Sequence, residues 1–340
     1  MHLYLTESAV KVGLSERRLT IKKADDGSLM RDFPFDDVEG ISVFGKPQIS
    51  THLLCECIRQ NMPVLFYSED GHYFGHLSSF EQVDPFRQKM QMYLSDDPRF
   101  CLEWSKLIVR AKLWNSLSLL RSYPGIYSFD AEEVRGLTHS LEYLDGACDV
   151  SQVMGFEGNG AKAYFNCLPK LLADHDFDFR GRSARPPRDP INSMLSFGYS
   201  ILFRNVLGAI NAVGLHPYFG FLHAVKQGHA ALASDLVEEW RAWIVDRTII
   251  ALVNDGEVLP SDFYKNEAGA IYMKKETMRL LTHRLGDAMV RSEVYFMEGG
   301  GRRRYGFQAA LHRKALMLVE AIEKRNPIYY QPFLWLKEED

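Results

Sequence analysis

Three stretches of the chain contain carboxylate and imidazole side chains that could bind a divalent cation. Glu157 lies among the glycines of 154–165, at the expected start of a helix, where glycine allows a ligand to approach the backbone closely. His223 ends the apolar, glycine-containing loop 214–223. Asp235 and Glu238 lie at positions i and i+3 of a helical pattern, so both can point to one side of that helix. One imidazole with two or three carboxylates suits Mg²⁺ or Mn²⁺.

Such a centre would be suited to phosphoryl transfer. A hard cation that keeps open coordination positions can polarise a phosphodiester and lower the pKa of a bound hydroxyl. Each stretch also has an ordinary structural explanation. Glu157 could be a first-turn carboxylate favoured by the helix dipole, His223 a buried core histidine, and the acidic stretch at 235–239 a solvated helix flank with partners such as Arg241.

Two arginine-rich segments could contact a nucleic-acid backbone, because the planar guanidinium matches the geometry of phosphate. The proline-rich loop 180–190 contains Arg180, Arg182, Arg185 and Arg188. The glycine-rich segment 299–306, expected to be flexible, contains Arg302 and Arg303. Alternatively, the first segment only balances the neighbouring acidic residues of 174–178. The sequence has no GxSxG, HExxH or dinucleotide-binding fingerprint, which disfavours those enzyme classes.

Composition indicates a packed globular protein of ordinary charge. The chain has 340 residues, of which 46% are hydrophobic and 25% charged, with a net charge of -4. That charge disfavours a nucleic-acid binder on average, although only a local basic surface has to meet the backbone. The five cysteines form no CxxC pair, so neither a disulfide framework nor a cysteine zinc site is expected. The first ten residues lack the features of a signal peptide or membrane span, so a cytoplasmic protein with no membrane partner is expected.

The elements that would position these residues change character along the chain. Short β patterns cover 9–14, 19–23, 40–44 and 63–67, with turn signals at 25–28 and 69–71 and one helical pattern at 49–59. We therefore predict a small β-rich domain at 1–79 and a linker at 80–88, where the polar stretch around Pro85 ends the β pattern.

Beyond the linker, the apolar residues recur with helical periodicity. The predicted helices cover 87–122, 132–149, 158–173, 190–213, 230–251, 274–293 and 307–325. The predicted fold class is a multidomain α+β protein, in which the β-rich domain is followed by a larger all-α, metal-binding catalytic domain at 89–340.

Four motifs, taken in order, resemble one known family. They are GluGly at 157–158, AspProIleAsnSerMetLeuSerPheGlyTyrSer at 189–200, GlyPheLeuHis at 220–223 and AspLeuValGluGluTrpArg at 235–241. Together with IleSerThr at 49–51 and ProValLeuPhe at 63–66, they are similar to the CRISPR-associated "Cas-one" endonuclease/integrase family of the spacer-acquisition complex. The resemblance covers nearly the whole chain.

The resemblance implies a function and its partners. It implies insertion of foreign DNA fragments into a CRISPR array by transesterification, with Mg²⁺ or Mn²⁺ as cofactor and double-stranded DNA as substrate. It also implies a homodimer formed by the N-terminal domain, and a heterohexamer-type complex with a small ferredoxin-like companion. By motif matching, Glu157, His223 and Glu238 are the metal ligands and Asp235 is a further acidic group near the metal, while Tyr199 and Asn192 belong to the helix preceding the site.

Some alternatives remain open at the level of sequence. His216 and His229 stand where relatives commonly have an acidic residue and an arginine, so either histidine could compete with His223 as a ligand. One rival function is a non-catalytic DNA-binding scaffold of the same assembly. A second is a metal phosphohydrolase acting on small phosphoesters, which the two basic segments disfavour.

Overall fold

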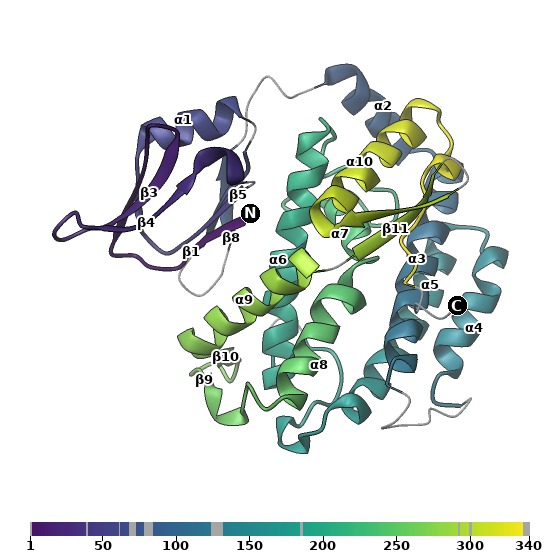
Figure 1. Ribbon diagram of the computed structural model, residues 1–340. Coiled ribbons are helices and arrows are strands. Elements are labelled where there is room, and N and C mark those ends of the chain that lie inside the picture. Colours follow the sequence, from purple (N-terminus) through teal and green to yellow (C-terminus); the bar gives the residue numbers. More distant parts are fainter. Residues whose placement is uncertain are drawn as a thin grey trace. The chain divides into compact units, whose positions relative to one another are not determined.

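The protein consists of two compact units, shown in the computed structural model of Figure 1. The structure describes residues 2–38, 40–60, 62–67, 73–77, 84–123, 132–183, 186–291, 293–298 and 301–335. The first unit is Met1–Gln82 and the second is Val83–Asp340. Within the described part, no helix combines the length and the apolar character needed to span a membrane.

The first unit contains two four-stranded sheets and one helix. One sheet has the order β1-β5-β7-β8, in which β1, β5 and β7 are parallel and β8 is antiparallel to β7. The other has the order β4-β3-β2-β6, a meander joined to β6 by a short parallel pairing. The strands are β1 (His2–Leu5), β2 (Val10–Ser15), β3 (Arg18–Lys23), β4 (Leu29–Pro34), β5 (Gly40–Phe44), β6 (Gln48–Ile49), β7 (Val64–Tyr67) and β8 (Tyr73–Leu77).

Alternation of apolar residues explains this core. In β2 and β3, Val10, Val12, Leu19 and Ile21 are buried while their neighbours along each strand face outward. Helix α1 (Thr51–Arg59) begins where the Ser50 hydroxyl accepts the backbone N–H of Leu53. The four predicted strands and the predicted helix of this unit are confirmed, whereas β1, β4, β6 and β8 were missed. The predicted turn at 69–71 lies outside the described residues.

The second unit is mainly helical, as predicted. Its helices are α2 (Pro85–Ser95), α3 (Pro98–Arg121), α4 (Arg135–Tyr143), α5 (Val150–Cys167), α6 (Pro190–Ala212), α7 (Ala231–Val237), α8 (Arg247–Asn254), α9 (Lys275–Arg291) and α10 (Phe307–Glu323). Residues 85–88, predicted as linker, already belong to α2 because the Asp84 carboxylate caps it and Pro85 is tolerated in the first turn.

This unit is not purely helical, which corrects the all-α prediction. One hairpin pairs β9 (Phe263–Lys265) with β10 (Ile271–Met273), and a second pairs β11 (Glu293–Glu298) with β12 (Gly301–Gly306). The expected flexible segment 299–306 therefore contains a strand. Valine, tyrosine and phenylalanine at 294–296 favour a strand, but no strand was predicted between the helices at 274–293 and 307–325.

Two predicted helices are interrupted. The pattern at 87–122 forms α2 and α3, which Asp97 separates by capping the second helix ahead of Pro98. The pattern at 230–251 forms α7, a π-helical segment Arg241–Asp246, and α8. Extra residues in a helical turn re-aim the side chains around them, and such turns are frequent at functional sites.

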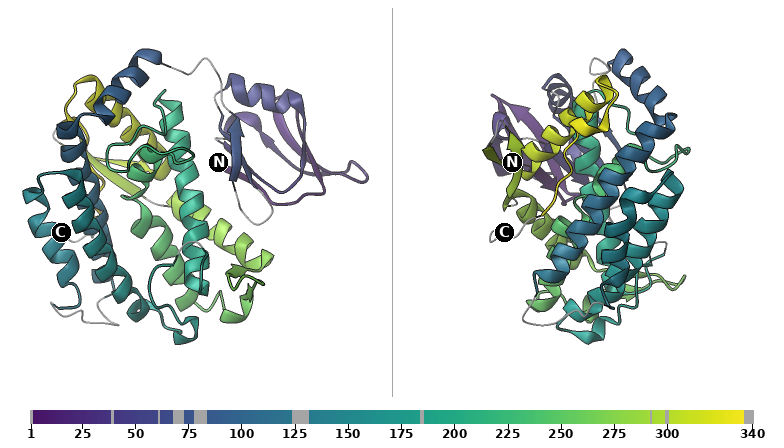
Figure 2. Two further views of the ribbon diagram at one scale, coloured as in Figure 1. Left: turned by 180° about the vertical axis from the view of Figure 1, so that it is seen from behind. Right: turned by 90° about the vertical axis from the view of Figure 1, so that its right-hand side faces the viewer.

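The helices that carry the candidate site pack closely around it. Helix α3 contacts α4 and α5, which lie beside it in Figure 2. It also contacts the π-helical segment, which in turn contacts α6. Two helical glycines permit this proximity. A Cβ on Gly160 of α5 would lie 2.3 Å from Leu113 of α3, and one on Gly198 of α6 would lie 2.5 Å from Val245. The backbones of α5 and α6 therefore approach the neighbouring elements more closely than any larger residue allows.

Candidate metal centre and its basic pocket

Glu157 lies in the middle of α5, which corrects its predicted position at a helix start. The helix begins at Val150, more than two turns before the predicted start at 158, and there the Asp149 carboxylate accepts the backbone N–H of Gln152. Glycines at 155, 158 and 160 obscured this start because they weaken helix propensity. The Glu157 side chain is 24% exposed, and its Oε1 accepts a hydrogen bond from the ammonium of Lys112 on α3.

Glu238 directly follows α7 and is almost completely buried, with 4% of its side chain exposed. Its Oε2 lies 2.7 Å from Nζ of Lys112, and its Oε1 lies 3.1 Å from Nη1 of Arg241. Burial alone would raise the pKa of Glu238, but the cations of Arg241 and Lys112 outweigh burial and hold the pKa below its ordinary value. Glu238 is therefore a buried carboxylate kept ionised by two cations.

Asp235 contacts both the backbone and the ring of His223. The fully buried Asp235 carboxylate accepts the backbone N–H groups of Phe221, Leu222 and His223 at 2.7 to 3.0 Å. Its Oδ1 also lies 2.8 Å from Nδ1 of the His223 ring. Asp235 and Glu238 therefore have different partners, because Asp235 binds the loop 220–223 whereas Glu238 pairs with Lys112 and Arg241. We predicted Asp235 as an acidic group near a metal, and its contacts make it a positioning residue for His223.

This pairing orients the imidazole. Burial lowers the pKa of His223, but the hydrogen bond and charge of Asp235 outweigh burial and raise the pKa above its ordinary value. When Nδ1 donates to Asp235, Nε2 is the ring nitrogen that remains for a ligand. Metal-binding histidines commonly donate their other nitrogen to a carboxylate in this way.

The donors suit a divalent cation by type, although their present positions do not enclose one. Among the described residues, no three acidic, histidine or cysteine side chains are gathered closely enough to hold a metal ion. The two carboxylates instead converge on the ammonium of Lys112. The buried Oε2 of Glu238 receives no hydrogen bond of good geometry from the residues that the structure describes. Its contact with Lys112 is therefore an ion pair only. Carboxylate oxygens that share one cation are suitable ligands for Mg²⁺ or Mn²⁺.

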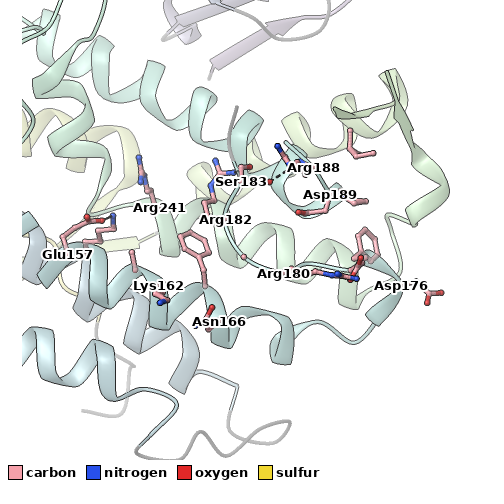
Figure 3. A pocket seen from close by; sticks show the side chains of 18 residues that line it. Glu157, Lys162, Asn166, Asp176, Arg180, Arg182, Ser183, Arg188, Asp189 and Arg241 are labelled. Carbon is pink, nitrogen blue, oxygen red and sulfur yellow. Dashed lines mark hydrogen bonds and ion pairs between the residues drawn. The ribbon is translucent and has the colours of Figure 1, made fainter. Parts of the chain in front are cut away.

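A polar pocket of about 1090 Å³ opens beside this centre. Lys112, Glu157 and Arg241 line one part of it, and the loop 176–190 lines another part. Figure 3 shows Glu157 and Arg241 on one side, with Arg182, Arg188 and Arg180 following toward Asp176 on the other. The second part of the lining therefore has three arginines, Arg180, Arg182 and Arg188, beside three aspartates, Asp176, Asp178 and Asp189. The arginines supply cationic groups that can bind an anion.

The predicted DNA-binding arginines differ in their contacts. Arg180 forms an ion pair with Asp178 at 2.8 Å, in agreement with the structural alternative. Arg182 donates to the Ser183 carbonyl, to Asn192 Oδ1 and to the Ser196 hydroxyl, so it shapes the pocket wall. Arg188 is exposed at the pocket. Arg185 lies outside the described residues, as do the side chains of Arg302 and Arg303, although β12 itself is described.

Asn192 and Asp189 fix the basic loop to the start of α6. Asp189 caps the helix through its contact with the Asn192 backbone N–H at 2.8 Å. The fully buried Asn192 amide donates to the Gly181 carbonyl and to Asp189, and its oxygen accepts the Ser183 backbone N–H. The motif at 189–192 therefore organises the pocket wall.

Tyr199 belongs to a buried network behind the pocket. Its hydroxyl donates to Asp246 Oδ1 at 2.7 Å, and the Tyr164 hydroxyl donates to Oδ2 at 2.6 Å. The guanidinium groups of Arg241 and Arg182 lie over the Tyr199 ring, 4.8 and 5.4 Å from its centroid. Burial raises the pKa of Asp246 to about 6, against the opposing effect of its hydrogen bonds and of the arginines. This network holds Arg241 against Glu238.

Sequence reasoning missed Lys112 and Asp246 as site residues and treated Arg241 only as a surface partner. A charged residue within an apolar stretch is a usable signal, and both Lys112 in α3 and Asp246 in 241–253 have that setting. Of the two competing histidines, His216 packs against Tyr218 and Phe219, and its Nδ1 accepts the Tyr218 backbone N–H. His229 lies beside His223, with 5.9 Å between the ring centroids.

Comparison with known proteins gives one consistent result. The family model described as CRISPR associated protein Cas1 matches residues 3–286. A protein of Mycobacterium tuberculosis named CRISPR-associated endonuclease Cas1 is 37% identical over 328 residues, covering 96% of this chain and 95% of that protein. One from Thermus thermophilus with the same description is 33% identical over 281 residues, covering 83% and 84%.

Solved structures share the fold. A Cas1 protein from Thermotoga maritima superposes with a TM-score of 0.79 at 21% identity, covering 99% of this chain and 100% of the other. A casposase bound to its integration product also has a TM-score of 0.79, at 24% identity, with 96% and 91% covered. The strand-rich first unit and the helical second unit are thus those of known structures, and the chain belongs to the CRISPR-associated Cas1 family.

Proposed function

We propose that this protein is a metal-dependent DNA endonuclease and integrase of CRISPR spacer acquisition, acting in the cytoplasm. Its reaction is transesterification, in which the 3′-hydroxyl of an incoming DNA fragment attacks a phosphodiester at the edge of a repeat. Membership of the Cas1 family supports this assignment. The observation that carries it is the convergence of Glu157 and Glu238 on one cation position at the edge of an arginine-lined pocket.

Glu157, Glu238 and Nε2 of His223 would hold a divalent cation, Mg²⁺ or Mn²⁺. When bound, the cation polarises the phosphodiester and lowers the pKa of the attacking hydroxyl. The residues of the chain supply the rest of the centre. Asp235 fixes the His223 ring, and Arg241, held between Glu238 and Tyr199, lies in the pocket where it can offset negative charge on the reacting phosphate.

DNA binding is proposed for the pocket arginines, with Arg188 the most available of them. Arg182 acts there mainly through the wall that it builds with Asn192. We further propose the assembly that the family resemblance implies: a homodimer formed by the first unit, which joins a small ferredoxin-like companion in a heterohexamer-type complex.

The first experiment measures joining of a labelled DNA duplex into a supercoiled, repeat-bearing plasmid with Mn²⁺ and the companion protein. We expect joining by the wild-type protein and a loss of at least about 100-fold in His223→Ala. His283→Ala is the matched control, because this exposed histidine pairs with Asp287 on α9. It should join DNA as the wild type does.

Two results would contradict the proposal. Joining by His223→Ala at the wild-type rate would remove the centre from the reaction. Binding of DNA without any metal-dependent joining or cleavage by the wild type would favour the non-catalytic scaffold, in which the same pocket only holds DNA.

A further inference from the structure

Lys112 is the shared partner of two proposed metal ligands. It lies on α3, whereas Glu157 lies on α5 and Glu238 follows α7, so three separate elements bring these side chains together. Only 12% of the Lys112 side chain is exposed. Its ammonium contacts Oε1 of Glu157 and lies 2.7 Å from Oε2 of Glu238. The cation position between the carboxylates is therefore filled by the chain itself.

Among the four side chains that form these ion pairs, the charges are balanced while Lys112 stays there. The carboxylates of Glu157 and Glu238 carry two negative charges, and Lys112 and Arg241 carry two positive charges. Adding a divalent cation to this set leaves an excess of positive charge in a site where Glu238 is buried. Like charges repel strongly when water is excluded. The excess falls when the phosphate of a DNA strand enters the adjoining pocket.

The Lys112 ammonium can also move toward the adjoining pocket. Lysine carries its charge on a flexible four-carbon stem, so its ammonium can change partners without movement of the helix. Lys112 lines the same pocket as Arg241 and Arg188. A phosphate in that pocket would offer the ammonium a new anionic partner when a metal takes its place on the carboxylates.

We propose that Lys112 acts as a resident cation that couples metal binding to DNA binding. Without metal, it holds Glu157 and Glu238 together and offsets their repulsion. A divalent cation must displace it, and bound DNA phosphate favours that displacement. Metal and DNA then bind cooperatively, each tightening the other by the same factor. This inference rests on the proposed function, because it uses the same carboxylates.

The test measures Mn²⁺ binding to the full-length protein by calorimetry, with and without a DNA duplex whose 3′ ends lack the hydroxyl. In the wild type, DNA should tighten Mn²⁺ binding. In Lys112→Met, Mn²⁺ alone should bind at least about tenfold more tightly than to the wild type, which corresponds to about 1.4 kcal/mol. The additional effect of DNA should be smaller in this variant.

The matched control is Lys106→Met, two turns earlier on α3, where the lysine contacts Glu103 and the Asp145 carbonyl. Its Mn²⁺ affinity and its coupling to DNA should equal those of the wild type. Lys112→Arg keeps the charge and should keep the coupling. If Mn²⁺ binds Lys112→Met no more tightly than the wild type, or if DNA tightens binding equally in both, the inference is wrong.

A stability measurement tests the same proposal even if Lys112→Met folds less stably than the wild type. In EDTA, Lys112→Met should unfold at a lower temperature than the wild type, because two carboxylates face each other without their cation. Added Mn²⁺ should raise its unfolding temperature more than that of the wild type, since the stabilisation by a ligand grows with the logarithm of its concentration divided by Kd. Equal increases in the two proteins would overturn the proposal.

Failure of the underlying function gives a different result. If Mn²⁺ binds neither the wild type nor Lys112→Met, or binds Glu157→Gln as tightly as the wild type, the metal centre itself is wrong. If Mn²⁺ binding depends on Glu157 but is unaffected by Lys112→Met, the proposed metal centre is retained and only the proposed role of Lys112 is wrong.

Discussion

Asp246 is a residue whose importance comes from its surroundings. It ends the π-helical segment, is 1% exposed, and receives hydrogen bonds from Tyr164 and Tyr199. Because water is excluded from it, its charged form depends on these hydroxyls and on the two nearby arginines. The same Tyr199 ring contacts Arg241. A buried carboxylate thus supports an arginine that reaches Glu238.

The raised pKa of Asp246 predicts a pH-dependent stability. Its folded pKa of about 6 exceeds its ordinary value of 3.8, so folding favours the protonated form. The stabilising contribution is complete below about pH 4 and is lost as the pH rises to about 6. That loss is on the order of 3 kcal/mol. Relative to Asp246→Asn, the wild type should therefore lose stability from pH 4 to 6 and remain constant above it.

Urea unfolding of both proteins at several pH values checks this. The difference between them isolates Asp246 from the other carboxylates that titrate in the same range. A difference that stays constant from pH 4 to 7 would show that the pKa of Asp246 is the same in the folded and unfolded states.

The loop that precedes α7 packs closely against that helix. A Cβ added to Gly220 would lie 2.7 Å from the Ala231 carbonyl carbon and 2.8 Å from Oδ2 of Asp235. Only glycine therefore lets the loop approach closely enough for Asp235 to accept the N–H groups at 221–223. This explains physically why GlyPheLeuHis is followed by an aspartate on the next helix.

We expect Gly220→Ala to displace the loop and with it His223. The predicted cost is about 1–3 kcal/mol of unfolding free energy, together with weaker Mn²⁺ binding. Gly208→Ala is a matched control, since it lies on α6 where a Cβ meets nothing within 4 Å. It should be neutral or stabilising by up to about 1 kcal/mol. Denaturant unfolding and Mn²⁺ titration of both variants provide the measurement, and equal behaviour of the two would refute the packing argument.

A second element, the C-terminal segment 330–335, is anchored directly behind the site. The fully buried Glu239 accepts the Phe333 backbone N–H at 2.5 Å and the Tyr330 hydroxyl, and its Oε2 lies 2.7 Å from the Lys314 ammonium. Asn115, one turn beyond Lys112 on α3, bonds to Glu239, Phe333 and Trp335. Glu239, the residue that follows Glu238, is therefore tied to Asn115 on α3, to Lys314 on α10 and to the segment 330–335.

Removal of this anchor should be costly. Glu239→Ala leaves the Lys314 charge buried without its carboxylate, which predicts a loss of about 3–5 kcal/mol of unfolding free energy. Glu276→Ala, at an exposed position of α9, should change the stability by less than about 0.5 kcal/mol. Urea unfolding compares the two. A loss below about 1 kcal/mol in Glu239→Ala would mean that the segment 330–335 is not held through this carboxylate.

At the scale of the whole molecule, a net charge of -4 must be reconciled with DNA binding. Spread over the surface, such a charge would repel the phosphate backbone. Six lysines and arginines line the pocket against four carboxylates, so its lining carries a small excess of positive charge. Buried carboxylates such as Glu239 and Asp246 are compensated internally. A local positive field is therefore compatible with an acidic protein.

This predicts a moderate salt dependence of DNA binding. If Arg188 contacts a phosphate, Arg188→Ala should reduce the slope of log K against log salt by about 0.9. Arg135→Ala, which removes an exposed arginine paired with Glu132 on α4, should leave the slope unchanged. Fluorescence anisotropy from 50 to 200 mM salt, roughly the range in which such contacts are lost, measures both slopes. Identical slopes for the wild type and Arg188→Ala would exclude that contact.

Local sequence patterns were sufficient to predict the order of the elements and the kind of chemistry. Apolar periodicity gave the strand-rich first unit and the main helices of the second, because it depends only on neighbouring residues. The motifs containing Glu157, His223 and Glu238 placed the chain in its family, and the comparisons confirm that membership. Their assignment as metal ligands stays a prediction.

The contacts of those residues depend on how distant elements pack together. Periodicity carries no information on which distant elements meet, so Lys112 could not be placed between two carboxylates from α5 and α7. Spacing at i and i+3 indicated that Asp235 and Glu238 can point to one side of the helix, yet the loop at 220–223 contacts Asp235, whereas Glu238 pairs with Lys112. The π-helical turn, which local propensity does not encode, aims Arg241 at Glu238 and Asp246 at two tyrosines. Long-range packing, rather than local pattern, divides the acidic residues between the proposed metal ligands and the residues that support them.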